Sequence, residues 1–157
     1  MGRKSIKDIR QQEIVRALYK TAKAEGLHNA SIKKVADEMN VNPSLILHYF
    51  KTKEDLIFAL IDYILNRYLN IYTIKSNRSA IDQLMEVLNN IFSRKWNTLV
   101  SDDVYYNCFT LIFRDPLIQK KYRQLHDSLR ESLTEHLEAC IDEGSLQLDD
   151  PKITANL

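Results

Sequence analysis

The segment over residues 43–50 is too short to bury a core of its own, yet it is crowded with side chains that can bind a polyanion. These are Ser44, His48 and Tyr49, together with Lys51 directly after the segment. Hydroxyl and imidazole groups exchange hydrogen bonds with bases or phosphates, and a lysine ammonium neutralises a phosphate. This chemistry requires that neighbouring elements hold the segment from behind while its polar surface stays exposed.

Other spacings offer little metal or catalytic chemistry. His136 and Cys140 lie four residues apart, which would make half of a metal site on one helix, but no further cluster completes it. A buried cysteine beside a surface histidine is therefore the expected arrangement. The sequence has no glycine-rich phosphate loop, no His-Glu-x-x-His motif and no Ser/His/Asp elbow. We expect no cofactor and no metal, and we expect the chain not to be an enzyme.

Few helix breakers interrupt the chain, and its apolar residues recur with helical periodicity. Three Gly and three Pro among 157 residues, with 45% hydrophobic and 27% charged residues, are typical of a globular all-α protein. The longest apolar run, residues 56–61, is far too short to span a bilayer, so we expect a cytoplasmic protein without a membrane partner. The periodicity predicts helices over residues 9–25, 32–39, 43–49, 53–69, 81–96, 104–113 and 117–143, with one more beginning at Pro151.

Cap residues mark the starts of the helices around residues 43–53. Ser31 can cap the short helix that follows it. Asn42 precedes Pro43, which fits the first position of a helix because an N–H there would have no intrahelical partner. Thr52, with Asp55 three residues later, forms a capping box that opens a long helix.

The charges are distributed unevenly along the chain. Residues 1–53 hold eleven Lys/Arg and five Asp/Glu, a net charge of +6, whereas residues 54–157 hold eleven and sixteen, a net charge of −5. The two parts together give the +1 of the whole chain. Solvated helix faces of random sign would explain this asymmetry, and so would an N-terminal module that faces a polyanion.

Two short helices that follow a longer one, with a three-residue turn at residues 40–42, are typical of a helix-turn-helix within a three-helix bundle. The helix over residues 43–49 would then read DNA, because a major groove about 12 Å wide admits one helix. We expect the bundle to hold this helix through Val41, Leu45 and Ile46. We expect its outward residues to be Pro43, Ser44, Leu47 and His48.

Residues 31–56, SIKKVADEMNVNPSLILHYFKTKEDL, resemble the TetR family of bacterial transcriptional regulators. The similarity is strong over about residues 10–60, and beyond them the all-helical layout and the helix lengths agree. The resemblance implies an all-α fold in which a DNA-binding domain over residues 1–51 precedes a ligand-binding and dimerisation domain over residues 52–157. The shared pattern is carried by Ser31-Ile32, Val35-Ala36, Val41-Asn42, His48-Tyr49-Phe50 and Lys53-Glu54-Asp55-Leu56.

The resemblance implies DNA contacts at particular positions. Lys53, Tyr49 and Ser31 would contact phosphates, and an N-terminal arm would reach the DNA backbone or the minor groove. Leu47 stands where the family often has tyrosine, and it offers a contact for a thymine methyl group instead of a hydroxyl. Phe50 is expected in the core. The complete set of expected DNA-binding residues is Arg3, Lys4, Ser31, Asn42, Pro43, Ser44, Leu47, His48, Tyr49 and Lys53.

Structural roles are the alternative for single residues of this set. Lys53 could be a solvated lysine, and His48 could bond to the C-terminal end of its helix, where a cation is favoured. The constellation as a whole favours DNA contact for Ser44, His48, Tyr49 and Lys53.

In the family, the helices after the reader enclose an effector pocket. Aromatic residues at helical spacing are more often core than ligand contacts, so both interpretations stay open for each of them. The acidic balance of residues 54–157 favours a cationic or neutral effector, although acidic groups on outer faces would carry no such meaning. The expected wall consists of Tyr63, Met85, Trp96, Tyr105, Cys108, Phe109, Phe113 and Tyr122.

Two functions remain in view from these patterns. The first is a repressor that binds a palindromic operator as a homodimer and is released by a small molecule, and the second is a helical DNA-binding dimer without an effector. An enclosed cavity would favour the first and a filled core the second.

Family members usually continue from a segment like residues 153–157 into another long helix, so we expect the given chain to lack its last helices.

Overall fold

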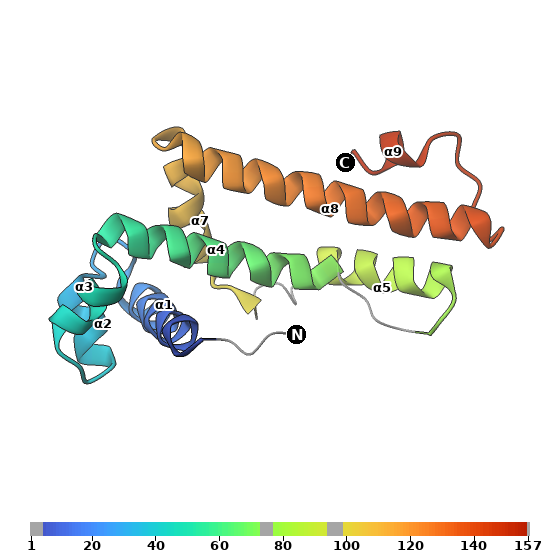
Figure 1. Ribbon diagram of the computed structural model, residues 1–157. Coiled ribbons are helices and arrows are strands. Elements are labelled where there is room, and N and C mark those ends of the chain that lie inside the picture. Colours follow the sequence, from blue (N-terminus) through green and yellow to red (C-terminus); the bar gives the residue numbers. More distant parts are fainter. Residues whose placement is uncertain (1–4, 73–76, 94–98, 157) are drawn as a thin grey trace. The chain divides into compact units, whose positions relative to one another are not determined.

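The computed structural model describes residues 5–72, 77–93 and 99–156, and this part of the chain contains helices and no strand (Figure 1). The chain divides into two compact units. Unit 1 comprises residues 1–64 and 101–118, and unit 2 comprises residues 65–100 and 119–157. The expected all-α fold is confirmed, whereas the expected domain boundary between residues 51 and 52 stays a prediction.

Three helices of unit 1 pack against one another in every pairing: α1 (Ile6–Glu25), α2 (Ile32–Glu38) and α3 (Pro43–Tyr49). Each contributes fully buried side chains, including Leu18, Val35 and Ile46. α3 has seven residues, and a helix of this length is not stable alone, so its conformation depends on this packing. The predicted three-helix bundle is therefore present.

Helix α1 begins at Ile6, three residues earlier than the predicted start at Ile9. The amide N–H of Asp8 donates to the Ser5 hydroxyl oxygen, and the Ser5 N–H donates to an Asp8 carboxylate oxygen, both at 3.1 Å. This capping box satisfies backbone donors that would otherwise lack a partner, which extends the helix by most of a turn.

The turn between α2 and α3 is built from local polar interactions. Asn40 has a φ of 54°, a left-handed conformation that asparagine tolerates better than most residues. The Asn42 side chain accepts a hydrogen bond from the Ser44 N–H at 2.9 Å, and Pro43 follows at the first helical position, as predicted. These residues fix the direction in which α3 leaves the turn.

Helix α4 (Lys53–Tyr72) begins with the predicted capping box. The Thr52 N–H donates to the Asp55 carboxylate and the Asp55 N–H donates to the Thr52 hydroxyl, both at 3.0 Å. Within unit 1, the helix buries Leu56 and Leu60. The position of Lys53 is therefore set by a rigid helix start.

The helix predicted over residues 104–113 differs in the structure. An α-helix, α7 (Asp102–Phe109), is followed by a 3-10 helix, η1 (Thr110–Phe113). The Arg114 N–H donates to the Leu111 carbonyl at 3.0 Å, which tightens the end of the segment. The next helix begins at Pro116. The proline ring disfavours the α conformation of the residue before it, Asp115, so the helical segment over residues 102–113 ends before this point.

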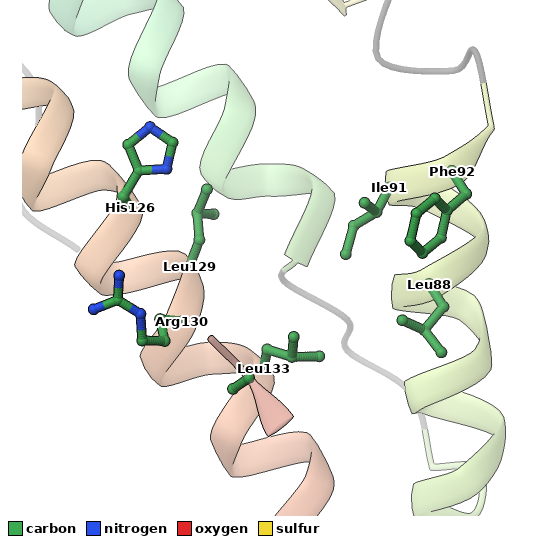
Figure 2. Close-up of a pocket in the computed structure, with 8 residues that line it drawn as sticks. Leu88, Ile91, Phe92, His126, Leu129, Arg130 and Leu133 are labelled. Carbon is green, nitrogen blue, oxygen red and sulfur yellow. The ribbon is translucent and has the colours of Figure 1, made fainter. Parts of the chain in front are cut away.

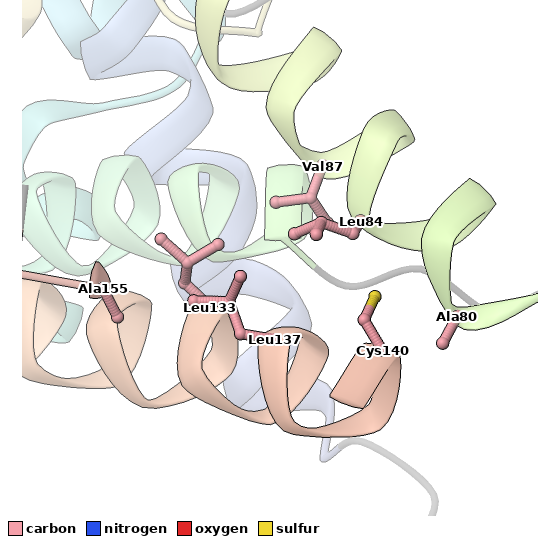
Figure 3. Close-up of a cluster of buried hydrophobic side chains, with 7 residues drawn as sticks. All are labelled: Ala80, Leu84, Val87, Leu133, Leu137, Cys140 and Ala155. Atoms are coloured by element: carbon pink, nitrogen blue, oxygen red, sulfur yellow. The ribbon is translucent and has the colours of Figure 1, made fainter. Parts of the chain in front are cut away.

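Unit 2 is organised around one hydrophobic cluster (Figure 3). Helix α5 (Ala80–Phe92) and the unit 2 part of α8 (Pro116–Asp142) contribute side chains at spacings of three and four residues, and the short helix α9 (Pro151–Thr154) ends beside them. The helices predicted over residues 81–96 and 117–143 are thus packed against each other here. The cluster consists of Ala80, Leu84, Val87, Leu133, Leu137, Cys140 and Ala155.

The helical periodicity of α5 predicts an apolar face that includes Leu84, Met85 and Phe92, and the structure buries only part of it. Leu84 lies in the cluster, whereas Met85 is exposed and Phe92 is 78% exposed. Val87, outside the predicted face, is fully buried in the cluster. Apolar residues cover more than one side of this helix, so their periodicity alone does not decide which side faces α8.

Polar contacts close the ends of unit 2. The Ala80 N–H donates to the Glu143 carboxylate at 2.8 Å, which ties the start of α5 to the end of α8. Gly144, with a φ of 71°, turns the chain, and Asp150 accepts from the N–H groups of Lys152 and Ile153 to start α9.

Within the described ranges no helix combines the length and apolar character that crossing a membrane requires.

Candidate nucleic-acid interface and cavity

Helix α3 separates its core residue from its outward residues, as predicted. Ile46 is 0% exposed, whereas its neighbour Leu47 is 44% exposed. Ser44 and His48 are exposed as well. Leu47 and His48 follow Ser44 by three and four residues, so the three side chains share one helical face. This face offers a hydroxyl, an imidazole and an apolar side chain, a combination that can contact base edges in a major groove.

The residues at the two ends of α3 are partly engaged in structural contacts. Asn42 is exposed, but its side-chain amide oxygen caps the helix by accepting from the Ser44 N–H. Pro43 is half-buried. The Tyr49 ring meets the His48 ring edge-on, with 5.1 Å between centroids, and the Tyr49 carbonyl accepts a hydrogen bond from the Gln11 side chain at 3.5 Å. The backbone carbonyl of the half-buried Tyr49 thus connects the end of α3 to α1. Phe50, expected in the core, is buried.

Two of the three predicted phosphate contacts, Ser31 and Lys53, lie at helix starts, whereas Tyr49 ends α3. Ser31 is exposed, and its hydroxyl caps α2 by accepting from the Lys34 N–H at 3.2 Å. Lys53 is half-buried in the first turn of α4. A helix start carries partial positive charge and unsatisfied N–H groups, so both positions suit an anion. Arg3 and Lys4 lie outside the described residues.

Two lysines beside these positions, one of them Lys51 directly after the segment over residues 43–50, were not included in the predicted set of DNA contacts. Lys33 and Lys51 are exposed, and within the described part of the chain neither forms an ion pair. Lys34, in contrast, is neutralised by Glu25. The available signal was position alone, since each missed lysine lies two residues from a predicted phosphate contact. Unpaired lysines keep their full charge for a phosphate.

The residues expected to form an effector wall are divided between the units. In unit 1, the Tyr63 ring lies 5.7 Å from that of Tyr19, and Tyr105 stacks on Phe109 at 6.1 Å. Phe113 is 81% exposed. These contacts are those of packed or surface aromatic residues, so the ligand role of this set stays a prediction.

The remaining members of that set have different surroundings. Cys108 is fully buried, and burial raises the pKa of its thiol to about 12. Burial also raises the pKa of the Tyr105 hydroxyl, with a smaller contribution from Tyr106. Tyr122 is buried in unit 2, Met85 is exposed there, and Trp96 lies outside the described residues.

A cavity of about 180 Å³ lies in unit 2 between α5, α8 and the end of α9. We refer to it as the α5–α8 cavity. Figure 2 shows its α5 side chains facing the row that α8 provides. None of the seven described residues of the predicted effector wall lines it. Its lining residues are Leu88, Ile91, Phe92, His126, Leu129, Arg130, Leu133 and Ala155.

Cys140 and His136, the pair that could have formed half of a metal site, have structural partners in α8 and its cluster. Cys140 is a free, buried thiol in the unit 2 cluster, and burial raises its pKa. His136 shares a 2.7 Å hydrogen bond with the Ser132 carbonyl through Nδ1. Among the described residues, no group of three histidine, cysteine or acidic side chains is arranged to hold a metal ion.

Comparison with known proteins gives two family matches along the chain. The family described as "Bacterial regulatory proteins, tetR family" matches residues 14–60, which contain α2, α3 and α1 from Ile14 onward. The family described as "Tetracyclin repressor-like, C-terminal domain" matches residues 79–157, which is half of the chain. The two matches cover the candidate DNA-reading helix and the α5–α8 cavity respectively.

Individual relatives agree with these matches. HTH-type transcriptional regulator BetI of Yersinia pestis (strain Pestoides F) is 31% identical over 65 residues, covering 41% of this chain and 33% of BetI. The chain thus aligns with about a third of the length of this curated relative. It also resembles, in fold, the crystal structure of a TetR transcription regulator from Haloarcula marismortui, with a TM-score of 0.82 and 22% identity over 94% of this chain and 78% of that one.

A further structural relative contains a small molecule. The transcriptional regulator from Saccharomonospora viridis in complex with choline has a TM-score of 0.69 and 17% identity, over 94% of this chain and 78% of that one. At this identity the likeness concerns the fold.

Proposed function

Since this chain belongs to the TetR family of bacterial transcriptional regulators, we propose that it binds a palindromic operator in double-stranded DNA as a homodimer, represses transcription there, and is released by a small molecule. The observation that carries the proposal is the outward face of α3. Ser44, Leu47 and His48 are exposed on it, while the buried Ile46 anchors the helix from behind.

Electrostatics support DNA as the partner of this face. The net charge of residues 1–53 is +6, and the exposed lysines 33 and 51 are not neutralised by described carboxylates. Each lysine–phosphate contact releases counterions, so a cluster of lysines around the reader supplies affinity that does not depend on sequence. The α3 side chains then supply the choice of sequence.

A homodimer is the assembly that a palindromic operator would require in this proposal. A two-fold dimer would place two α3 helices about one helical turn of DNA apart, roughly 34–36 Å, and would read inverted half-sites. In this proposal α4 links the two activities, because its first turn carries Lys53 and its later residues belong to unit 2. A ligand that binds two conformations of this linkage with different affinities would change DNA affinity.

Release by a small molecule is supported by two observations. The α5–α8 cavity provides space of about 180 Å³, and a protein of similar fold is in complex with choline. Because this cavity is open to solvent rather than enclosed, the alternative of a DNA-binding dimer without an effector stays a second candidate function. The aromatic residues first predicted as the effector wall stay a second, separate proposal for the ligand site.

Selection of bound sequences from a random duplex pool tests the DNA-binding part. We expect enrichment of one inverted repeat, because two identical readers select two identical half-sites. His48→Ala should change the preferred bases, since this side chain lies on the outward face. Absence of any enriched sequence would overturn the assignment of α3 as a reader.

A matched pair of lysine substitutions tests the electrostatic part. Lys53→Ala should weaken binding to the enriched and to unrelated duplexes by similar factors, because a phosphate contact carries no base information. Lys152→Ala removes the same charge from the exposed start of α9 in unit 2 and should leave affinity unchanged. Equal losses for both variants would indicate a nonspecific effect of net charge and contradict the assigned phosphate contact.

A further inference from the structure

We propose that the α5–α8 cavity binds a small amphiphilic anion, namely a carboxylate with an apolar body of about six carbon atoms. We also propose that this anion is the effector, a second part that rests on the proposed function. The inference depends on the chemistry of the residues that line the cavity, which differs from the acidic character of the chain around it.

Apolar side chains form most of the cavity. α5 contributes Leu88, Ile91 and Phe92, and α8 contributes Leu129 and Leu133 (Figure 2). Hydrocarbon bound here leaves water without displacing any polar partner, so the apolar part of a ligand gains by entering. The cavity measures about 180 Å³, compared with about 150 Å³ for an enclosed apolar cavity that accommodates benzene, and it is open to solvent beside Phe92, which is 78% exposed. This space suits a ring or a chain of about six carbons.

Two basic side chains complete the lining. His126 and Arg130 lie four residues apart on α8, so they follow each other along one helical face. A guanidinium has five N–H donors in a planar fork that matches a carboxylate. No Asp or Glu is among the described lining residues. The lining therefore contributes positive charge where Arg130 borders the cavity, and the nearest described carboxylate to Arg130 is that of Asp127, which pairs with it.

The ion pair of Arg130 leaves capacity for a ligand. Arg130 Nη1 lies 3.3 Å from an Asp127 carboxylate oxygen, and the two side chains are 48% and 61% exposed. Exposed pairs of this kind contribute little because water and salt screen them. The remaining N–H donors of Arg130 can bind a second carboxylate without breaking the first contact.

The acidic residues of unit 2 do not argue for a cationic ligand. The carboxylates of α8 are exposed, including Glu131, Glu135 and Glu138, and none of them lines the cavity. The acidic side chains of α8 thus lie on outer faces of that helix. A cationic ligand such as choline would find one aromatic ring, that of Phe92, where recognition of quaternary ammonium groups uses a cage of several.

Three ligands with the same six-carbon tail separate the contributions. Hexanoate, 1-hexanol and hexylammonium are titrated into the full chain by calorimetry, with choline as a further cation. We expect hexanoate to bind at least about tenfold more tightly than the other three, since a charge-assisted hydrogen bond is made only by the carboxylate. Equal affinity for hexanol, tighter binding of hexylammonium or choline, or no binding of hexanoate would each overturn the proposal.

Substitutions at exposed positions assign the effect to this cavity. Arg130→Gln should remove the preference for hexanoate over hexanol, whereas Arg123→Gln, an exposed arginine on α8 outside the lining, should leave it intact. Phe92→Ala should weaken hexanoate and hexanol by similar factors, and Leu117→Ala, which shortens an exposed apolar side chain of unit 1 outside both candidate ligand sites, should weaken neither. If Arg123→Gln acts like Arg130→Gln, the site is elsewhere.

The effector role has its own readout. Saturating hexanoate should lower the affinity of the chain for its selected duplex, and Arg130→Gln should abolish this shift. Arg130-dependent binding of hexanoate with unchanged duplex affinity would overturn the effector role and leave the anion site standing. Failure to select any duplex would refute the proposed function instead, while calorimetry would still decide the anion site.

Discussion

Replacing Ile46 by alanine tests how α3 is held in place. The helix has seven residues, and Ile46 is its one side chain that is 0% exposed. The matched control is Leu47→Ala, which shortens the adjacent aliphatic side chain on the outward face, where Leu47 is 44% exposed. The two variants remove the same number of carbon atoms from the same short helix, so they differ in burial rather than in chemistry.

The magnitude follows from burial. Ile46→Ala removes three carbon atoms from a fully buried side chain, a loss of about 2.4 kcal/mol in transfer free energy at about 0.8 kcal/mol per carbon. The cavity left behind adds to this loss, so we expect the free energy of unfolding to fall by about 2–5 kcal/mol. Leu47→Ala should lower it by at most about 1 kcal/mol, since much of that side chain already meets water.

Urea unfolding followed by circular dichroism measures the difference. With a urea dependence of about 2 kcal/mol/M, the midpoint for Ile46→Ala should drop by about 1–2.5 M. The midpoint for Leu47→Ala should change by less than about 0.5 M, while its preferred DNA sequence should change. If Leu47→Ala destabilised the protein as much as Ile46→Ala, the outward face assigned to α3 would be wrong.

Three further outcomes are expected. Affinity for duplex DNA should fall steeply with salt, and Lys53→Ala should reduce the slope of log K against log salt by about 1, as measured by fluorescence anisotropy; a slope unchanged by the substitution would contradict the phosphate contact. Thr52→Ala removes the hydroxyl that accepts from the Asp55 N–H at 3.0 Å and should cost about 1 kcal/mol in urea unfolding, whereas no loss would show that the capping box does not stabilise α4. Burial raises the pKa of the Cys108 thiol from its ordinary value of 9.0 to about 12, so the folded protein keeps a proton that the unfolded chain releases; stability should decline as pH rises from about 9 to about 12, and Cys108→Ala should show a shallower decline over this range.

Much of the DNA-reading bundle could be predicted because its signals are local. The Asn42-Pro43 start of α3 and the Thr52–Asp55 capping box each involve residues at most three positions apart, and both are present in the structure. The same kind of signal existed at Ser5 and Asp8, so the early start of α1 was readable and was missed.

The interior of unit 2 could not be read in this way. On α5 the exposed Phe92 and the buried Val87 are both apolar, and only the packing against α8 decides which one is covered. The α5–α8 cavity joins Leu88 to Arg130 and to Ala155, residues whose separation along the chain leaves no periodic trace.

The sequence by itself determined the all-α class, the helix-turn-helix and the separation of Ile46 from Leu47, because capping and helical periodicity act over one or two turns. Tertiary structure alone decided which lysines stay unpaired, which side of α5 is buried and where space is left beside Arg130. Burial and charge pairing depend on neighbours brought close by packing, and a single sequence does not specify those neighbours.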